Sequence, residues 1–97
     1  MSNFITRIEL HQAKSPDDYN QLHSAMLSEG FSHLINSDNG NIYELPTAEY
    51  YKNTSSSIED VYNSASLAAN TTGKSFWVLI TEWTRAKWKL QEVKKPL

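Results

Sequence analysis

The residues that can do chemistry in this chain are few, and three of them alternate along one segment. Arg7, Glu9 and His11 lie two positions apart near the N-terminus. In an extended strand such residues share one face, so the three side chains line up. A histidine transfers protons near neutral pH and an arginine holds phosphate. We therefore take His11 as the best general-base candidate, with Arg7 and Glu9 beside it. The alternative is that Arg7 and Glu9 only form a cross-strand ion pair.

The other two histidines are weaker candidates. His23 falls within an apolar helical stripe, and His33 falls on the inner face of a predicted hairpin, so structural roles are expected for both. The histidine spacings include no HxH or HxxxH pair, which argues against a zinc site. The chain has no cysteine, hence no disulfide, thiol nucleophile or thiolate site. We expect no metal and no cofactor.

A basic, aromatic segment ends the chain. Residues 84–97 carry five of the nine Lys and Arg residues and one of the eleven acidic residues. Cations mixed with tryptophans are typical of surfaces that hold single-stranded nucleic acid. The alternative is a strand or arm that packs Trp88, Leu90 and Val93 on a sheet edge, with lysines that deter aggregation. The candidate nucleic-acid-binding residues are Trp83, Arg85, Lys87, Trp88 and Lys89.

Elements that would position these residues can be read from periodicity and end signals. Asn3–His11 alternates apolar and polar residues and predicts a half-buried strand. Ser15 and Pro16 begin a predicted helix that ends at Gly30. A second helix is expected from a cap at Ser56 or Ser57 to Gly73. Ser75–Trp83 is rich in aromatic and β-branched residues, which predicts a strand.

Asp38-Asn39-Gly40 lies between two strand-like runs and predicts a hairpin. A two-residue turn would pair Ile35 with Glu44. A three-residue loop, with Gly40 in the left-handed region, would pair Ile35 with Tyr43. The second register gathers the apolar side chains on one face, so it is preferred. Pro46 should then end or bend the strand, because proline cannot donate to a ladder.

The resulting order is β-α-β-β-α-β, the ferredoxin-like arrangement. It predicts an α+β fold with a four-stranded antiparallel sheet, both helices on one face, and a C-terminal strand or arm. Residues 1–83 would form the core, and residues 84–97 the basic tail. The open sheet face would carry Arg7, Glu9, Trp77 and Trp83, which suits docking or dimerisation.

Composition sets broad limits. Ninety-seven residues fit one domain, and the net charge of −2 says little by itself. The N-terminus has charges where a signal peptide needs an apolar core, and no apolar run reaches the ~18 residues of a membrane span. We expect a soluble, cytoplasmic protein without a membrane partner.

Four stretches resemble a family of small bacterial proteins grouped with the antitoxin GhoS. They are FITRIELHQA (4–13), DYNQLHSAMLSEGFS (18–32), SDNGNIYELPTAEY (37–50) and AANTTGKSFWVLITE (68–82). The resemblance covers most of residues 3–82 and implies a ferredoxin-like fold. It also implies an endoribonuclease that acts as the antitoxin of a type V toxin–antitoxin pair. After Glu82 the chain departs from the family, whose members have a polar, glycine-containing turn there.

Two functions stay open on this basis. The first is a GhoS-like antitoxin, a metal-independent endoribonuclease that acts on single-stranded RNA through its 2′-hydroxyl. The second is a non-enzymatic regulatory module, a homodimer through its sheet face or tail, that binds protein or nucleic acid. A phage-borne inhibitor of a host defence system is an example of the second class.

Overall fold

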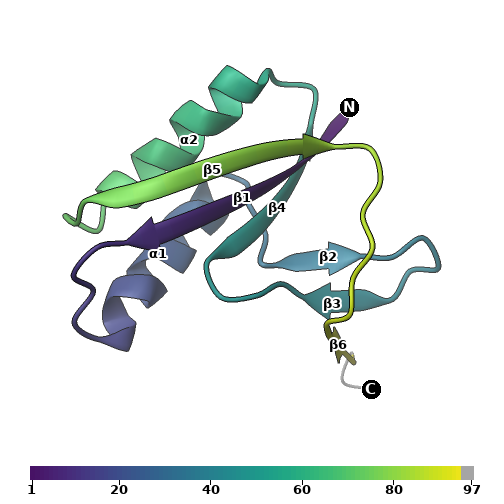
Figure 1. Cartoon of the computed structure of the whole chain (residues 1–97), viewed down its shortest axis with the longest axis horizontal. Helices are drawn as coiled ribbons and strands as arrows, with labels where there is room; N and C mark the ends of the chain where they lie inside the picture. Colours follow the sequence, from purple (N-terminus) through teal and green to yellow (C-terminus); the bar gives the residue numbers. More distant parts are fainter. Residues whose placement is uncertain (95–97) are drawn as a thin grey trace.

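The computed structural model describes residues 1–94 of the chain. This part of the chain forms two helices and six strands (Figure 1). In chain order these elements are β1 (Ser2–Leu10), α1 (Pro16–Ser28), β2 (Leu34–Asn36), β3 (Ile42–Glu44), β4 (Glu49–Thr54), α2 (Ile58–Asn70), β5 (Phe76–Trp83) and β6 (Gln91–Val93). Among residues 1–94, neither helix has the length and apolar character needed to cross a membrane.

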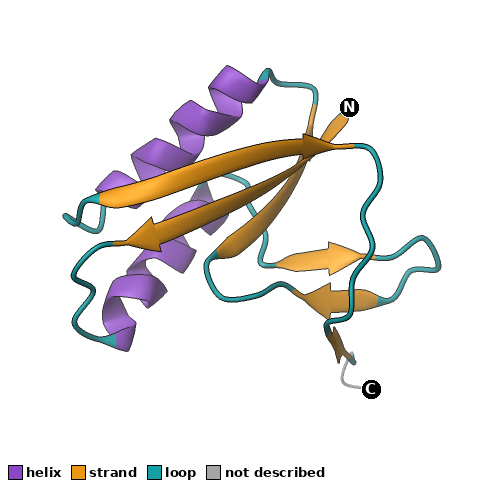
Figure 2. Ribbon diagram, viewed as in Figure 1, coloured by secondary structure: helices purple, strands orange, loops and turns teal. Residues whose placement is uncertain are grey.

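The main sheet has three antiparallel strands in the order β4-β1-β5. Both helices cover one of its faces, and the other face is open (Figure 2). The predicted alternation of the first strand is confirmed, because Phe4, Ile8 and Leu10 are buried while Arg7 and Glu9 are exposed. The sheet therefore fixes which residues are available to a partner or substrate.

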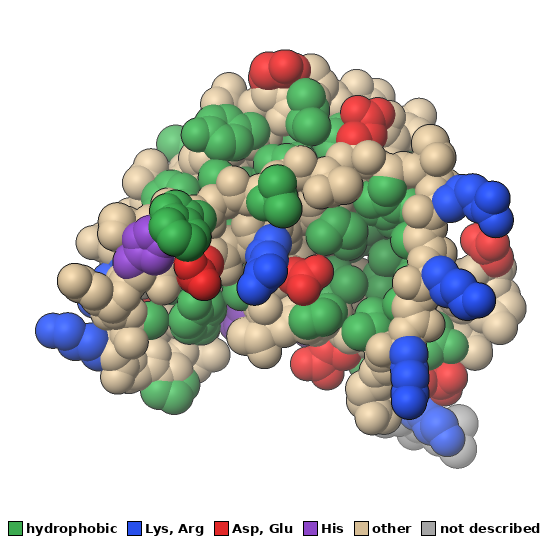
Figure 3. All heavy atoms as spheres, in the orientation of Figure 1, with side chains coloured by type: hydrophobic (Ala, Val, Ile, Leu, Met, Phe, Trp, Pro, Cys, Tyr) green, Lys and Arg blue, Asp and Glu red, His purple; other side chains and the backbone are tan. Residues whose placement is uncertain are grey.

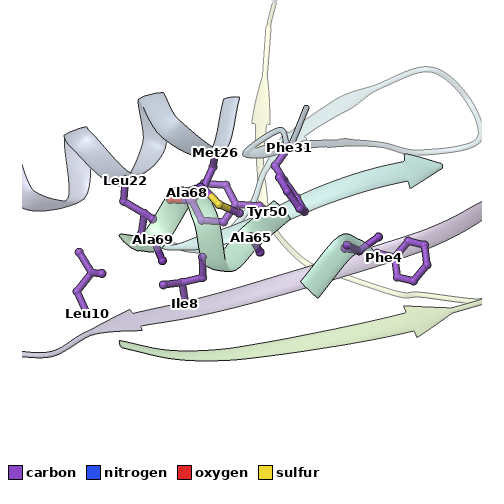
Figure 4. Close-up of a cluster of buried hydrophobic side chains, with 11 residues drawn as sticks. Phe4, Ile8, Leu10, Leu22, Met26, Phe31, Tyr50, Ala65, Ala68 and Ala69 are labelled. Atoms are coloured by element: carbon purple, nitrogen blue, oxygen red, sulfur yellow. The ribbon is translucent and has the colours of Figure 1, made fainter. Parts of the chain in front are cut away.

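The core lies between this sheet and the two helices (Figure 4). Residues of β1, α1, β4 and α2 meet there with almost no exposed area. Small side chains on α2, such as Ala65 and Ala69, let that helix approach the sheet closely. The buried members are Phe4, Ile8, Leu10, Leu22, Met26, Phe31, Tyr50, Val61, Ala65, Ala68 and Ala69.

The helix ends follow the local signals. Pro16 occupies the first turn of α1 after Ser15, although the Ser15 side chain makes no capping bond. In α2 the hydroxyl of Ser57 accepts a hydrogen bond from the Asp60 N–H at 3.1 Å, so Ser57 is the cap. Gly30 follows α1 with φ +87°, a conformation that suits glycine.

The prediction of a four-stranded sheet is wrong, although the α+β class is confirmed. The hairpin of β2 and β3 leaves the main sheet and forms a second three-stranded antiparallel sheet, in the order β2-β3-β6. The chain turns between β3 and β4, where Glu49 N–H donates to the Pro46 carbonyl and Ala48 has φ +63°. An isolated bridge between Ser32 and Tyr51 still links the two sheets.

The hairpin itself has the preferred register. Ile35 pairs with Tyr43, and Gly40 has φ +88° in the loop. The structural alternative for the tail is also confirmed as far as residue 94, because β6 pairs antiparallel with β3. The segment between β5 and β6 crosses from one sheet to the other beside the open face (Figure 1).

Candidate functional site

Arg7 and Glu9 of β1, and His11 directly after this strand, lie on the open face of the main sheet. His11 is held on two sides. Its Nδ1 lies 3.3 Å from the Ser75 hydroxyl, and its Nε2 lies 3.8 Å from a carboxylate oxygen of Glu9. The Nε2 atom is buried and has no hydrogen-bond partner within residues 1–94. An imidazole fixed at one nitrogen, with a carboxylate near the other, has a defined orientation for proton transfer.

Trp77 adds a stacking surface to this group. Its ring meets the His11 ring edge-on, with 4.7 Å between the centroids, yet 69% of the residue remains exposed. Arg7, Glu9, Trp77 and Leu79 line a shallow pocket of about 280 Å³ together with Val78. We call Arg7, Glu9, His11, Ser75 and Trp77 the β1 cluster. It combines a cation, a carboxylate, an imidazole and an exposed indole on one surface, which Figure 3 shows from the open side.

The predicted nucleic-acid-binding residues divide into two groups. Trp83 and Trp88 are half-buried and pack on aromatic residues of the body. The Trp83 ring lies 6.2 Å from that of Tyr51, and the Trp88 ring lies 5.8 Å from that of Tyr43. Trp88 therefore holds the tail on the small sheet, the packing role that the alternative interpretation gave it.

The cations of the tail are free of such contacts. Arg85, Lys87 and Lys89 are exposed, and none forms an ion pair with the described residues. Figure 3 shows several Lys and Arg side chains along this side of the molecule. A cleft of about 410 Å³ separates Arg85 and Lys87 from Asn36 and Asp38 of the hairpin. Trp83 lines this cleft, and its indole N–H is a buried donor with no partner among residues 1–94.

The β1 cluster and the tail lie at opposite ends of the main sheet. His11 N–H donates to the Ser75 carbonyl, whereas Trp83 pairs with Asn3 at the other end of β1. Eight residues of strand separate His11 from Asn3, about 26 Å at 3.3 Å per residue. Within one chain, the structure does not bring the candidate catalytic and nucleic-acid-binding residues together.

A further polar group was missed at the sequence level. His23 Nδ1 lies 2.5 Å from the hydroxyl of buried Tyr50, on the helix side of the sheet. Burial lowers the pKa of His23, and His33 lowers it further, while burial raises the pKa of Tyr50. His23, His33 and Glu44 line a pocket of about 230 Å³. The helical stripe placed His23 near the core, but no local signal pairs it with Tyr50, 27 residues away.

Within residues 1–94, no group of three or more histidine and acidic side chains is arranged to hold a metal ion. No protein-family model matches the chain, and no curated protein sequence matches it. Function must therefore be inferred from the two surfaces described above.

Proposed function

We propose that this protein binds single-stranded RNA on the open face of the main sheet and cleaves it, as a GhoS-like endoribonuclease antitoxin. The observation that supports this most is the β1 cluster. Arg7 and Glu9 share one pocket with Trp77, and His11 touches the Trp77 ring. Single-stranded RNA is typically held by bases stacked on exposed aromatic rings and phosphates paired with cations.

Each member of the cluster has a role in the proposed reaction. A base stacks on Trp77, and Arg7 holds the phosphate that follows it. His11 takes the proton of the RNA 2′-hydroxyl at Nδ1, where the substrate replaces the contact with the Ser75 hydroxyl, because Nε2 is buried. The 2′-oxygen then attacks phosphorus. The bond to the 5′-oxygen breaks, the leaving oxygen takes a proton, and a 2′,3′-cyclic phosphate remains. Glu9 lies near the imidazole and stabilises its protonated form.

The test is cleavage of a uridine- and adenine-rich single-stranded RNA in the presence of EDTA. We expect products with cyclic-phosphate and 5′-hydroxyl ends, and a rate that His11→Ala lowers by about 10²–10⁴-fold. His33→Ala is the matched control, because His33 is an exposed histidine outside the cluster. If the wild-type protein cleaves no faster than His11→Ala, the enzymatic part of the proposal is wrong.

The antitoxin part has its own test. A type V antitoxin removes the messenger of a membrane toxin, so we expect the gene beside this one to encode a short membrane protein. Co-expression should lower the level of that messenger, and His11→Ala should abolish the effect. An unchanged messenger level with active wild-type protein would separate RNA cleavage from an antitoxin role.

A second candidate is a binding module without catalysis. It is favoured by the exposed apolar side chains of the open face, where Trp77 is 69% exposed and Leu79 is 63% exposed. Exposed apolar patches of this kind mark interaction sites. Binding without cleavage in the RNA assay would favour this candidate, and the His11→Ala variant would then bind as tightly as the wild type.

A further inference from the structure

The outer edge of β5 is an unpaired strand edge. β5 ends the main sheet on one side, and no strand among residues 1–94 pairs with its outer edge. Because His11 N–H donates to the Ser75 carbonyl, the odd-numbered residues of β5 exchange backbone bonds with β1. The alternation then points the N–H and C=O groups of Phe76, Val78, Ile80 and Glu82 outward.

This edge lacks the features that keep sheet edges apart. Natural edge strands are protected by proline, lysine, bulges or short length. The eight residues of β5, FWVLITEW, contain no proline and no basic residue. Beside the edge, Ile58 and Tyr62 of α2 are 37% and 49% exposed, and they line a groove of about 520 Å³ with Val78 and Ile80.

We propose that β5 pairs with β5 of a second copy of this chain, antiparallel and with the twofold axis at Leu79. This register puts Val78 opposite Ile80 of the other copy, and Phe76 opposite Glu82. All four outward-facing residues then form hydrogen-bonded pairs, which no shift of the register achieves. Leu79 faces its own counterpart, so two of the most exposed apolar side chains cover each other.

The charged residues along β5 and the groove beside this strand are both compatible with a second copy of the chain. In this register Glu82 lies diagonally across from Lys74 of the other copy, on the same face, and the twofold axis repeats the pairing. No like charges are directly opposed along the paired strands. Val78 and Ile80 of the second copy lie next to the groove, where they cover Ile58 and Tyr62. A self-complementary edge is what a twofold dimer requires.

A single-cysteine variant tests the register directly, since the chain has no cysteine. Leu79→Cys places two thiols in a pair without backbone hydrogen bonds, at a separation that suits a disulfide. Leu67→Cys is the matched control, because Leu67 is also 63% exposed but lies outside the groove. We expect mild oxidation to link the first variant into covalent dimers and not the second. Equal cross-linking of the two variants overturns the proposal.

Molar mass in solution gives a second measurement. The wild-type protein and Leu67→Lys should sediment with twice the mass of one chain, and Leu79→Lys with the mass of one chain. A wild-type protein that stays a single chain at high micromolar concentration would also overturn the dimer. Circular dichroism checks that each variant is folded.

The β5 dimer is independent of the proposed function. If the wild-type protein cleaves no RNA, the proposed function is wrong, and the cross-linking result decides the dimer alone.

Discussion

The ring of His11 meets the ring of Trp77 edge-on, with 4.7 Å between the centroids, on the face of the main sheet that no helix covers. Trp77 belongs to β5, and His11 is the first residue after the adjacent strand β1. The contact leaves much of Trp77 open to a ligand, because 69% of the residue is exposed.

Replacement of Trp77 by alanine is therefore expected to weaken RNA binding without unfolding the protein. A stacked base contributes ~1–3 kcal/mol, so affinity should fall about 5- to 150-fold. Fluorescence anisotropy with a labelled single-stranded RNA measures this. Leu67→Ala, at a similarly exposed position on α2, is the control and should bind like the wild type. If Trp77→Ala and Leu67→Ala bind the RNA with equal affinity, Trp77 does not stack on a base.

The tail cations should act through phosphate charge and not through base identity. Removal of one cation that pairs with a phosphate of a single strand makes the slope of log affinity against log salt shallower by ~0.7. We expect Lys87→Ala to show this change on every RNA sequence tested. Lys14→Ala removes an exposed lysine elsewhere and should leave the slope as it is. If Lys87→Ala and Lys14→Ala change the slope equally, the lysines attract RNA only through the overall charge of the protein.

Much of the fold was predictable because its signals are local. The pairing of Ile35 with Tyr43 follows from one glycine in the loop and from the need to bury one face. Gly30 follows the end of α1 as expected, with φ +87°, whereas α2 ends at Asn70, three residues before Gly73 with φ +71°. The shared face of Arg7, Glu9 and His11 required only the period of a strand.

The division into two sheets was not predictable from local signals. It depends on the turn from Pro46 to Glu49, in which Ala48 takes a left-handed conformation that alanine rarely adopts. The residue type of Ala48 does not predict such a conformation. The contact of His23 with Tyr50 was missed for a different reason, since it joins two elements that only the packed core brings together.

Trp88 is expected to hold the tail in place and not to bind RNA bases. Its contact with Tyr43 is an aromatic pair worth ~0.5–1.5 kcal/mol beyond the buried area. In Trp88→Ala, trypsin should cleave after the tail cations faster, while the melting temperature of the main sheet changes little. Trp77→Ala is the control, because Trp77 does not contact the tail. Unchanged proteolysis would show that β6 holds the tail without Trp88.

The hydroxyl of Tyr50 should contribute to stability through His23. Tyr50→Phe keeps the buried ring but leaves the imidazole without this partner, which costs ~1 kcal/mol of unfolding free energy. Tyr62→Phe removes a hydroxyl from a residue that is 49% exposed and should change stability by much less. Urea denaturation of both variants gives the comparison. Equal stabilities would mean that water replaces the bond at no cost.

The lowered pKa of His23 makes stability depend on pH with a definite sign. Burial first, and then His33, hold the folded-state pKa below the ordinary value of 6.5. As pH falls through that value the unfolded chain takes up a proton before the folded chain does, so the unfolding free energy decreases. The decrease ends below the folded-state pKa, where both states are protonated. Tyr50 stays neutral throughout, because burial raises its pKa.

His23→Gln removes this titration and should flatten the change in unfolding free energy between about pH 7.5 and about pH 5. His33 and Glu44, which border the same pocket, are unchanged in this variant. Ser24→Gln, at an exposed position of the same helix, is the control and should keep the slope of the wild type. Urea denaturation at a series of pH values measures all three proteins. A His23→Gln curve parallel to that of the wild type would show that the pH dependence arises elsewhere in the fold.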